Sequence, residues 1–243
     1  MIQTKKDVFI KNIFSTVAPS MDFLNLIFSL GLCHVWRRKA VALSNVRKND
    51  KVLDVCTGTG DLALILMEKM GPEGSFTGID FCRNMLDLAE IKMKKKAKAM
   101  PNNVSFIEGD AKDLAFPDNT FDLVTVAFGM RNIPDTFSAL KEIKRVLKPG
   151  GRFMCLELTT PDKAWFLPFY KWYTFRIMPY VAKYFVKKMT PYAYLPRSIV
   201  SFYPSKEFSG IITECGFSGI AACTMTMGVA TIFTAQKREA ASP

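Results

Sequence analysis

The stretch that decides the fold runs from Lys51 to Asp61 and reads KVLDVCTGTGD. Its apolar half predicts a short buried strand, and the glycines that follow, Gly58 and Gly60, favour a tight turn into a helix. Such a turn lets the backbone approach a nucleoside cofactor closely, and Asp80 lies about 20 residues further on, where an acid can bind a ribose diol. The turn fits a nicotinamide cofactor and S-adenosylmethionine alike, so it leaves the cofactor open.

Strands and helices alternate on either side of this turn. The further predicted elements are strands at 75–80, 104–108, 121–127 and 152–158, helices at 61–70, 84–98 and 139–147, and a closing antiparallel pair at 217–227 and 229–236. Continuous apolar strands separated by helices are typical of an α/β fold with a mostly parallel sheet that is buried on both faces. The lysine run from Lys92 to Lys98 is interpreted as the solvated face of its helix.

The chain is predicted to form one domain, residues 1–243, because neither repeats nor a low-complexity linker interrupt it. Its predicted segments are an N-terminal helical arm (1–45), a cofactor-binding core (46–161), a basic aromatic cap (162–207) and the closing strands (208–243).

The amino-acid composition limits the classes of protein to which this chain can belong. Apolar residues make up 49% and charged residues 23%, the ordinary globular mix, while the net charge of +11 favours an anionic partner or membrane surface. Six cysteines without a C-x-x-C pair and a single histidine argue against a metal site and predict a reducing, cytoplasmic setting. The longest apolar stretch, residues 23–36, is short of the roughly 20 residues that span a bilayer, so no membrane crossing is expected.

Residues 163–206 break the strand–helix rhythm. They contain all seven tyrosines, two of the three tryptophans and eight Lys or Arg, without any Asp or Glu. An insertion before the closing pair would lie over the carboxyl edge of the sheet, where open α/β sheets bind ligands. We expect a helical cap over a large apolar substrate that faces an anionic lipid surface, with a subdomain that only packs on the core as the alternative.

Three features favour S-adenosylmethionine over a nicotinamide. They are Gly109-Asp110-Ala111 after the third strand, Phe121-Asp122-Leu123-Val124 at the start of the fourth, and Arg145–Gly151 before the fifth. A carboxylate at the first of these positions can accept a hydrogen bond from an adenine amino group. Each feature is weak alone, but their order and spacing together are specific.

The chain resembles the C-methyltransferase family of ubiquinone and menaquinone biosynthesis over nearly its whole length. The resemblance is carried by Asp22-x-x-Asn25 with Ser29, Gly31, Leu32 and Trp36, by residues 53–61, by Phe128-Gly129-Met130-Arg131-Asn132, by residues 145–151 with Glu157, and by Tyr192-x-Tyr194-Leu195 with Ser198-Ile199. It implies a class I, Rossmann-like methyltransferase fold with a seven-stranded, mostly parallel sheet. It also implies methyl transfer from S-adenosylmethionine to a ring carbon of a polyprenylated quinol, which is demethylmenaquinol above all, the benzoquinol precursor of ubiquinone, or both.

The resemblance assigns residues to the cofactor. Asp54, Gly58 and Gly60 would shape its methionine end, and the other expected contacts are Thr59, Asp80, Asp110, Ala111 and Ala127, where some members have Ser. The catalytic candidates are Arg131, Asn132 and Tyr192.

Chemistry suggests their roles. A ring carbon becomes nucleophilic when the neighbouring hydroxyl loses its proton, and a guanidinium stays charged, so Arg131 is expected to stabilise the oxyanion rather than to act as the base. Asn132 would orient Arg131 or bind the second quinol oxygen. The base is left open among Tyr192, Tyr194, Asp22, His34 and water.

Several alternatives remain. Another lipid acceptor, such as a sterol or a phospholipid, would use the same cofactor site. A nucleic-acid enzyme is disfavoured because no Asn/Asp-Pro-Pro-aromatic set follows the fourth strand, and Tyr184-x-x-x-Lys188 is the only further hint of a nicotinamide reductase. The head group of the quinol and a homodimer are left open, and the expected location is the cytoplasm, with peripheral contact on the inner face of the membrane.

Overall fold

The computed structural model describes residues 5–95, 101–161, 163–185 and 190–239, with the side chains of 8–95, 101–161, 163–181 and 194–239. At its centre is a seven-stranded sheet in the order β3-β2-β1-β4-β5-β7-β6, in which only the contacts of β7 are antiparallel. The strands are β1 (Lys51–Val55), β2 (Ser75–Asp80), β3 (Asn103–Glu108), β4 (Phe121–Ala127), β5 (Leu147–Leu158), β6 (Phe217–Met225) and β7 (Ala230–Lys237). The predicted fold class is confirmed.

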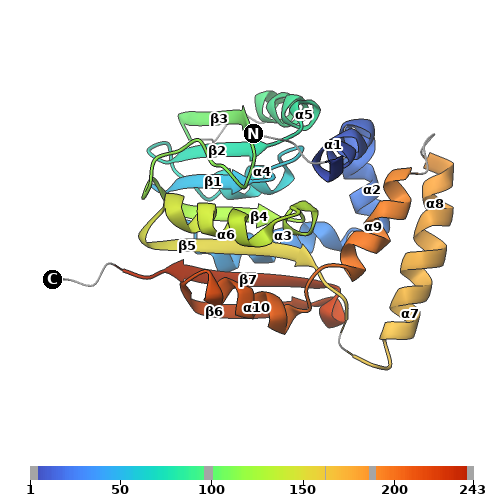
Figure 1. Ribbon diagram of the computed structural model, residues 1–243. Coiled ribbons are helices and arrows are strands. Elements are labelled where there is room, and N and C mark those ends of the chain that lie inside the picture. Colours follow the sequence, from blue (N-terminus) through green and yellow to red (C-terminus); the bar gives the residue numbers. More distant parts are fainter. Residues whose placement is uncertain (1–4, 96–100, 162, 186–189, 240–243) are drawn as a thin grey trace.

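Helices cover both faces of the sheet, which explains why β1 and β4 are buried almost throughout (Figure 1). One face packs against α6 (Thr136–Val146) and α10 (Ser205–Glu214), and the other against α3 (Leu32–Ser44), α4 (Asp61–Met67) and α5 (Arg83–Lys95). The buried residues Leu140 and Ile143 show how α6 presents one apolar stripe to the sheet. This packing leaves the carboxyl edge of the parallel strands free for a site.

The remaining helices gather at that edge (Figure 1). They are α1 (Lys5–Val17), α2 (Met21–Phe28), α7 (Leu167–Trp172), α8 (Met178–Phe185) and α9 (Thr190–Val200). A π-helical turn, η4 (Tyr173–Ile177), joins α7 to α8, so that 167–185 run as one long helix. The segments predicted as arm and cap are thus helical where the structure describes them, but only part of the arm stands at this edge, because its last helix, α3, packs on a face of the sheet.

Several element boundaries differ from the sequence prediction, among them the end of α4, at Met67 rather than at 70. Helix α6 begins at Thr136 rather than at 139, because the Asp135 side chain caps it by accepting from the Ser138 amide at 3.0 Å. Strand β5 begins at Leu147 rather than at 152, with a bulge against β4 that accommodates the Pro149-Gly150-Gly151 stretch. Helix α10 crosses the expected boundary between the cap and the closing strands, while the predicted end of the helix at 84–98 lies outside the described residues.

No single described helix has the length and apolar composition to cross a membrane. Two neighbouring segments, Val8–Phe28 and Leu32–Ser44, have them only when taken together, and they are bent by 94°.

Candidate functional site

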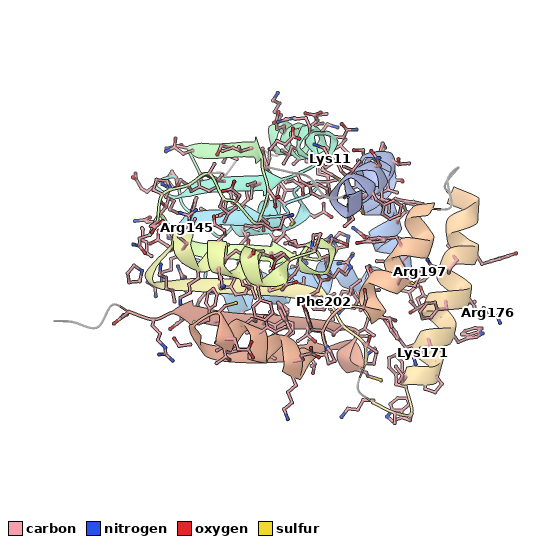
Figure 2. The ribbon with its side chains drawn as sticks, viewed as in Figure 1. Lys11, Arg145, Lys171, Arg176, Arg197 and Phe202 are labelled. Atoms are coloured by element: carbon pink, nitrogen blue, oxygen red, sulfur yellow. The ribbon has the colours of Figure 1, made fainter. Side chains whose placement is uncertain are left out.

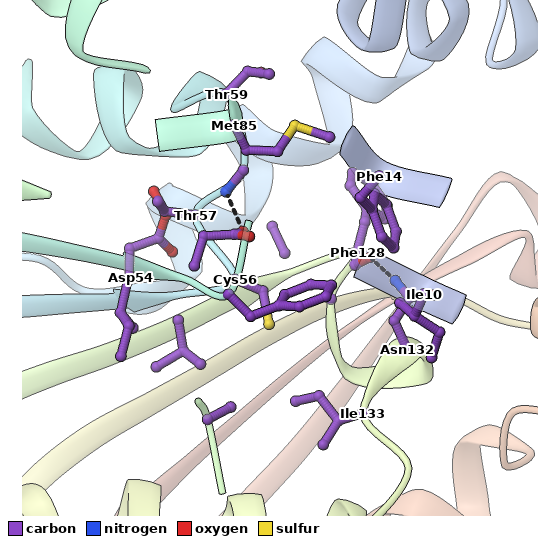
Figure 3. Close-up of a pocket in the computed structure, with 18 of the residues that line it drawn as sticks. Ile10, Phe14, Asp54, Cys56, Thr57, Thr59, Met85, Phe128, Asn132 and Ile133 are labelled. Carbon is purple, nitrogen blue, oxygen red and sulfur yellow. Dashed lines mark hydrogen bonds between the residues drawn. The ribbon is translucent and has the colours of Figure 1, made fainter. Parts of the chain in front are cut away.

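A cavity of about 310 Å³ opens at the carboxyl edge of β1, β2 and β4 (Figure 3). Its size lies at the lower end of the range for small-molecule sites. The loops after these strands form its floor, and α1 covers it with Ile10 and Phe14. Among the predicted cofactor residues, all but Gly60 line the cavity directly: Asp54, Gly58, Thr59, Asp80, Asp110, Ala111 and Ala127.

The turn after β1 depends on left-handed backbone conformations. Cys56 and Gly58 both have φ of +57°, and Gly60 has φ of +81°. A β-carbon at Gly60 would lie 3.1 Å from the Cβ of Ala89 on α5, so glycine allows α4 to start close to α5. Gly60 therefore shapes the turn from behind, while Gly58 and Thr59 face the cavity.

Asp80 braces the turn. Its Oδ2 accepts from the Gly58 amide at 2.9 Å, and its Oδ1 accepts from the Cys82 amide at 3.0 Å. Burial raises the pKa of this carboxyl to about 6, against the lowering effect of the amide hydrogen bonds. Each carboxylate oxygen can accept a further hydrogen bond, so Asp80 can hold a diol while it fixes the turn.

Asp54 lies deeper and leaves one oxygen free. Its Oδ1 accepts from Thr125 Oγ1 at 2.6 Å, whereas its Oδ2 and the neighbouring Thr57 Oγ1 are buried without a hydrogen-bond partner among the described residues. Burial raises the pKa of Asp54 to about 6. Buried polar atoms are normally satisfied, so these two orphaned oxygens are suited to the charged ammonium end of an amino-acid-bearing cofactor. The residues present therefore fit S-adenosylmethionine.

Thr59 belongs to a polar cluster that connects the turn to the N-terminal arm. Its Oγ1 donates to Asp22 Oδ1 at 2.5 Å and accepts from Lys92 Nζ at 3.0 Å. Lys92 also contacts Asp22 at 2.5 Å and Asp61 at 2.6 Å, and Arg37 lies 3.3 Å from Asp61. The interpretation of Lys92 as a solvated surface lysine was therefore wrong, because this side chain turns inward to two carboxylates.

The adenine end of the expected cofactor site lies after β3. Asp110 Oδ1 accepts from the Lys112 amide at 2.9 Å, which orients the carboxylate, and Ala111 is buried beside it as an apolar wall. Ala127 ends β4 on the opposite side of the cavity.

Arg131 lines the cavity in a buried ion pair. Its Nη1 lies 2.6 Å from Glu157 Oε1 on β5 and donates to the Phe128 carbonyl at 2.5 Å, and the Arg131 amide donates to Glu157 Oε2 at 3.1 Å. The Glu157 side chain is fully buried, and Arg131 Nε is buried without a partner among the described residues. Arg131 is thus a fixed positive charge at the cavity, but a carboxylate partly compensates it.

Asn132 is held beside Arg131. Its Nδ2 donates to the Phe128 carbonyl at 3.2 Å, and its Oδ1 accepts from the Tyr194 hydroxyl at 3.1 Å. Burial raises the pKa of Tyr194, so this phenol stays protonated and acts as a donor. Tyr192 lies on α9, but its side chain is outside the described residues.

Helix α1 is held over the cavity by a contact with the end of β3 and a contact with α9. Lys11 Nζ lies 2.7 Å from Glu108 Oε1 at the end of β3, and the Phe9 ring meets Tyr194 edge-on with 6.3 Å between ring centroids. The sequence analysis did not identify these lid residues, since Phe9 and Lys11 carry no motif of their own. Among the other base candidates, His34 is exposed and does not line the cavity, and Asp22 is held by Lys92 and Thr59.

The model of the ubiE/COQ5 methyltransferase family matches residues 1–237. The chain belongs to this family. A demethylmenaquinone methyltransferase from Staphylococcus epidermidis is 39% identical over 240 residues, covering 99% of this chain and 97% of that protein. The protein of the same name from Staphylococcus aureus strain JH9 is 40% identical over 230 residues, covering 95% of this chain and 93% of the relative.

Solved structures support the fold of this family member. A SAM-dependent methyltransferase from Thermotoga maritima has a TM-score of 0.65 at 15% identity, covering 94% of this chain and all of that chain. A SAM-dependent methyltransferase from Aquifex aeolicus has a TM-score of 0.61 at 20% identity, covering 82% and 88%. At these identities the likeness concerns the fold alone, which is that of class I methyltransferases.

Proposed function

We propose that this chain transfers the methyl group of S-adenosylmethionine to a ring carbon of demethylmenaquinol in menaquinone biosynthesis. The observation that carries the proposal is a fixed guanidinium, Arg131, beside Asn132 on the cavity that the cofactor residues line. The names of the relatives at 39–40% identity over nearly the whole chain support the same acceptor.

The cofactor supplies an electrophilic methyl group when bound. Asp80 would accept from its ribose hydroxyls, Asp110 from the adenine amino group, and Asp54 and Thr57 would bind the ammonium of its methionine portion. These residues would hold the cofactor at several points of the same cavity that Arg131 lines.

Arg131 and Asn132 would act on the acceptor. When the quinol hydroxyl loses its proton, negative charge spreads to the neighbouring ring carbon. This carbon would take the methyl group with release of the neutral thioether S-adenosylhomocysteine, and it would then lose its own proton to water, which restores the aromatic ring. The Arg131 guanidinium stabilises the negative oxygen, and one such donor typically contributes about 3–4 kcal/mol to the rate. Asn132 Nδ2, oriented through Tyr194 on Oδ1, would donate to a quinol oxygen.

Mass spectrometry of parallel reactions tests this function. Purified protein and S-adenosylmethionine are mixed in detergent with reduced demethylmenaquinol, a reduced benzoquinol precursor, a sterol and a phospholipid. We expect one methyl group on demethylmenaquinol at the highest rate, and none on its oxidised form. Faster methylation of the sterol or the phospholipid would contradict demethylmenaquinol as the acceptor and assign that lipid instead.

A further inference from the structure

The long helix formed by α7, η4 and α8 has two faces of opposite character. Tyr170, Thr174 and Met178 follow at intervals of four residues and are buried against the rest of the molecule. The opposite face and the turn that leads into the helix expose large aromatic side chains, with relative exposures of 71% for Trp165 in the turn and, on the helix, 57% for Phe169, 54% for Trp172 and 62% for Tyr180. We call these four residues the aromatic ridge.

The rings at the start of the ridge form a continuous surface. The centroids of Trp165 and Phe166 are 5.7 Å apart, those of Phe166 and Phe169 5.9 Å, and those of Phe169 and Trp172 6.0 Å. Contiguous exposed apolar surface of this kind is rare on soluble monomeric proteins and usually marks an interaction site.

Positive charges flank the ridge without acidic partners. Lys163, Lys171, Arg176 and Arg197 are exposed, and none of them forms an ion pair within the described residues. Figure 2 shows Lys171 and Arg176 on this helix and Arg197 on the adjacent α9. Since no Asp or Glu occurs between 163 and 206, the surface is complementary to a negatively charged partner.

The ridge is fixed to the arm and adjoins the acceptor end of the site. Tyr173 Oη donates to the Phe28 carbonyl of α2 at 3.1 Å, and Leu30, two residues beyond Phe28, is 78% exposed. Helix α9 carries Tyr194, which contacts Asn132, only three residues before Arg197. A partner on this surface would therefore lie close to α9, which packs against α8 and reaches Asn132 at the cavity.

We propose that the aromatic ridge and its flanking cations dock on an anionic lipid bilayer. Trp and Tyr suit the boundary between hydrocarbon and water, and each Lys or Arg near an anionic leaflet strengthens binding about fivefold at low salt. The docking itself does not depend on the acceptor, whereas its use in catalysis, to take a prenylated quinol directly from the bilayer, rests on the proposed function.

Vesicle sedimentation without cofactor or acceptor tests the docking. We expect the wild-type protein to sediment with phosphatidylcholine vesicles that contain phosphatidylglycerol, and at least tenfold less with phosphatidylcholine alone. The variant Trp165→Ser/Phe169→Ser/Trp172→Ser should lose at least tenfold of the binding, and Lys171→Glu/Arg176→Glu should lose more at low salt than at high salt. Phe137→Ser, on α6, is the matched control and should bind as the wild type does.

Tryptophan fluorescence keeps the test independent of how the variants fold. Trp36 is buried, so a blue shift when anionic vesicles are added to the wild type would report Trp165 and Trp172 entering an apolar environment. No shift and no sedimentation would overturn the proposal, as would undiminished binding of the folded triple variant. A dimer that becomes monomeric in that variant, without vesicle binding by the wild type, would assign the ridge to a second copy of the chain instead.

A separate assay distinguishes this proposal from the proposed function. None of the three substituted aromatic residues lines the cavity, so the triple variant should methylate a short-chain, water-soluble demethylnaphthoquinol at the wild-type rate while losing turnover on vesicle-embedded acceptor. Equal loss on both acceptors would overturn the membrane role. If the wild type methylated none of the quinols, the proposed function would be contradicted, whereas the docking proposal would still be decided by the vesicle sedimentation.

Discussion

Arg131 and Glu157 meet in a buried ion pair, with Nη1 and Oε1 2.6 Å apart at the end of the candidate active site. Glu157 also accepts from the amides of Arg131 and Leu158, so three donors surround one carboxylate. Removing one partner of such a pair leaves a buried charge uncompensated. The pair therefore fixes the guanidinium in place and makes its position depend on β5.

Glu157→Gln should lower the free energy of unfolding by about 3–5 kcal/mol, because the Arg131 charge then lacks its partner. Chemical denaturation measures this loss. The matched control is Asp118→Asn, which breaks the exposed Arg145–Asp118 pair at 2.7 Å and should cost less than about 1 kcal/mol. Equal losses of unfolding free energy in the two variants would show that burial does not determine how much the Arg131–Glu157 pair stabilises the protein.

Arg131→Lys should keep the charge and the fold but lower kcat at least tenfold, because lysine cannot reproduce the planar guanidinium. Steady-state kinetics with a quinol acceptor and calorimetric binding of S-adenosylhomocysteine provide the two measurements. Cofactor affinity should stay within about threefold of the wild type, since the loss should fall on transition-state stabilisation. Unchanged turnover would remove Arg131 from the mechanism.

Tyr194→Phe should reduce kcat about tenfold with little change in stability. The substitution deletes the hydroxyl that donates to Asn132 Oδ1, so the amide is free to rotate away from the acceptor. Tyr203→Phe is the control, because this ring stacks on Phe208 away from the cavity and no hydrogen bond is found for its hydroxyl among the described residues. A Tyr194→Phe enzyme with wild-type kcat would show that Asn132 needs no such support.

Cofactor affinity should fall in acid through the titration of Asp80. Burial raises its pKa to about 6, so the carboxylate that accepts from a ribose diol is present above pH 6 and lost below it. Calorimetry should show S-adenosylhomocysteine binding weaken by up to about tenfold per pH unit below 6. Asp80→Asn should bind weakly and make this profile shallower without abolishing it, because Asp54, whose pKa is also about 6, still titrates. An unchanged slope in Asp80→Asn would assign the whole titration to Asp54 or another group.

Asp54→Asn should raise the free energy of unfolding at pH 7 while weakening cofactor binding. Because burial raises the folded-state pKa from 3.8 to about 6, Asp54 contributes stability below pH 4 that is lost as the pH rises through 6. The neutral amide avoids this loss, which amounts to about 2–3 kcal/mol. Denaturation at pH 7 with and without S-adenosylhomocysteine measures both effects, and a destabilised, tightly binding variant would contradict them.

Some features of the fold and site followed directly from the sequence. The apolar runs and the Gly58–Gly60 turn predicted the parallel strands and the turn that borders the cavity, because these signals are local and periodic. The capped start of α6 at Asp135 and the bulged start of β5 were missed, since one depends on a single side-chain bond and the other on pairing with β4. The local pattern of apolar residues therefore predicts that a helix or strand forms, but the residue at which it begins depends on side-chain bonds and strand pairing.

Contacts between distant residues were harder to foresee. Lys92 reads as one member of a solvated lysine run, yet it bonds to Thr59 and Asp22, which lie 33 and 70 positions away in the printed sequence. Glu157 was one of the residues on which the family resemblance rested, but no residue near it in the sequence indicated that it would form an ion pair with Arg131. Such pairings depend on the way helices and strands stack in three dimensions, which a linear pattern does not encode.

Transfer of a ¹³C-labelled methyl group tests the central claim most directly. The protein is incubated with labelled S-adenosylmethionine and chemically reduced demethylmenaquinol, and the product is examined by NMR. We predict a new carbon-bound methyl signal on the quinone ring, present with the reduced acceptor and absent with the oxidised one. A methyl signal on oxygen, or no transfer by an enzyme that still binds S-adenosylhomocysteine, would contradict the assignment as a quinol C-methyltransferase.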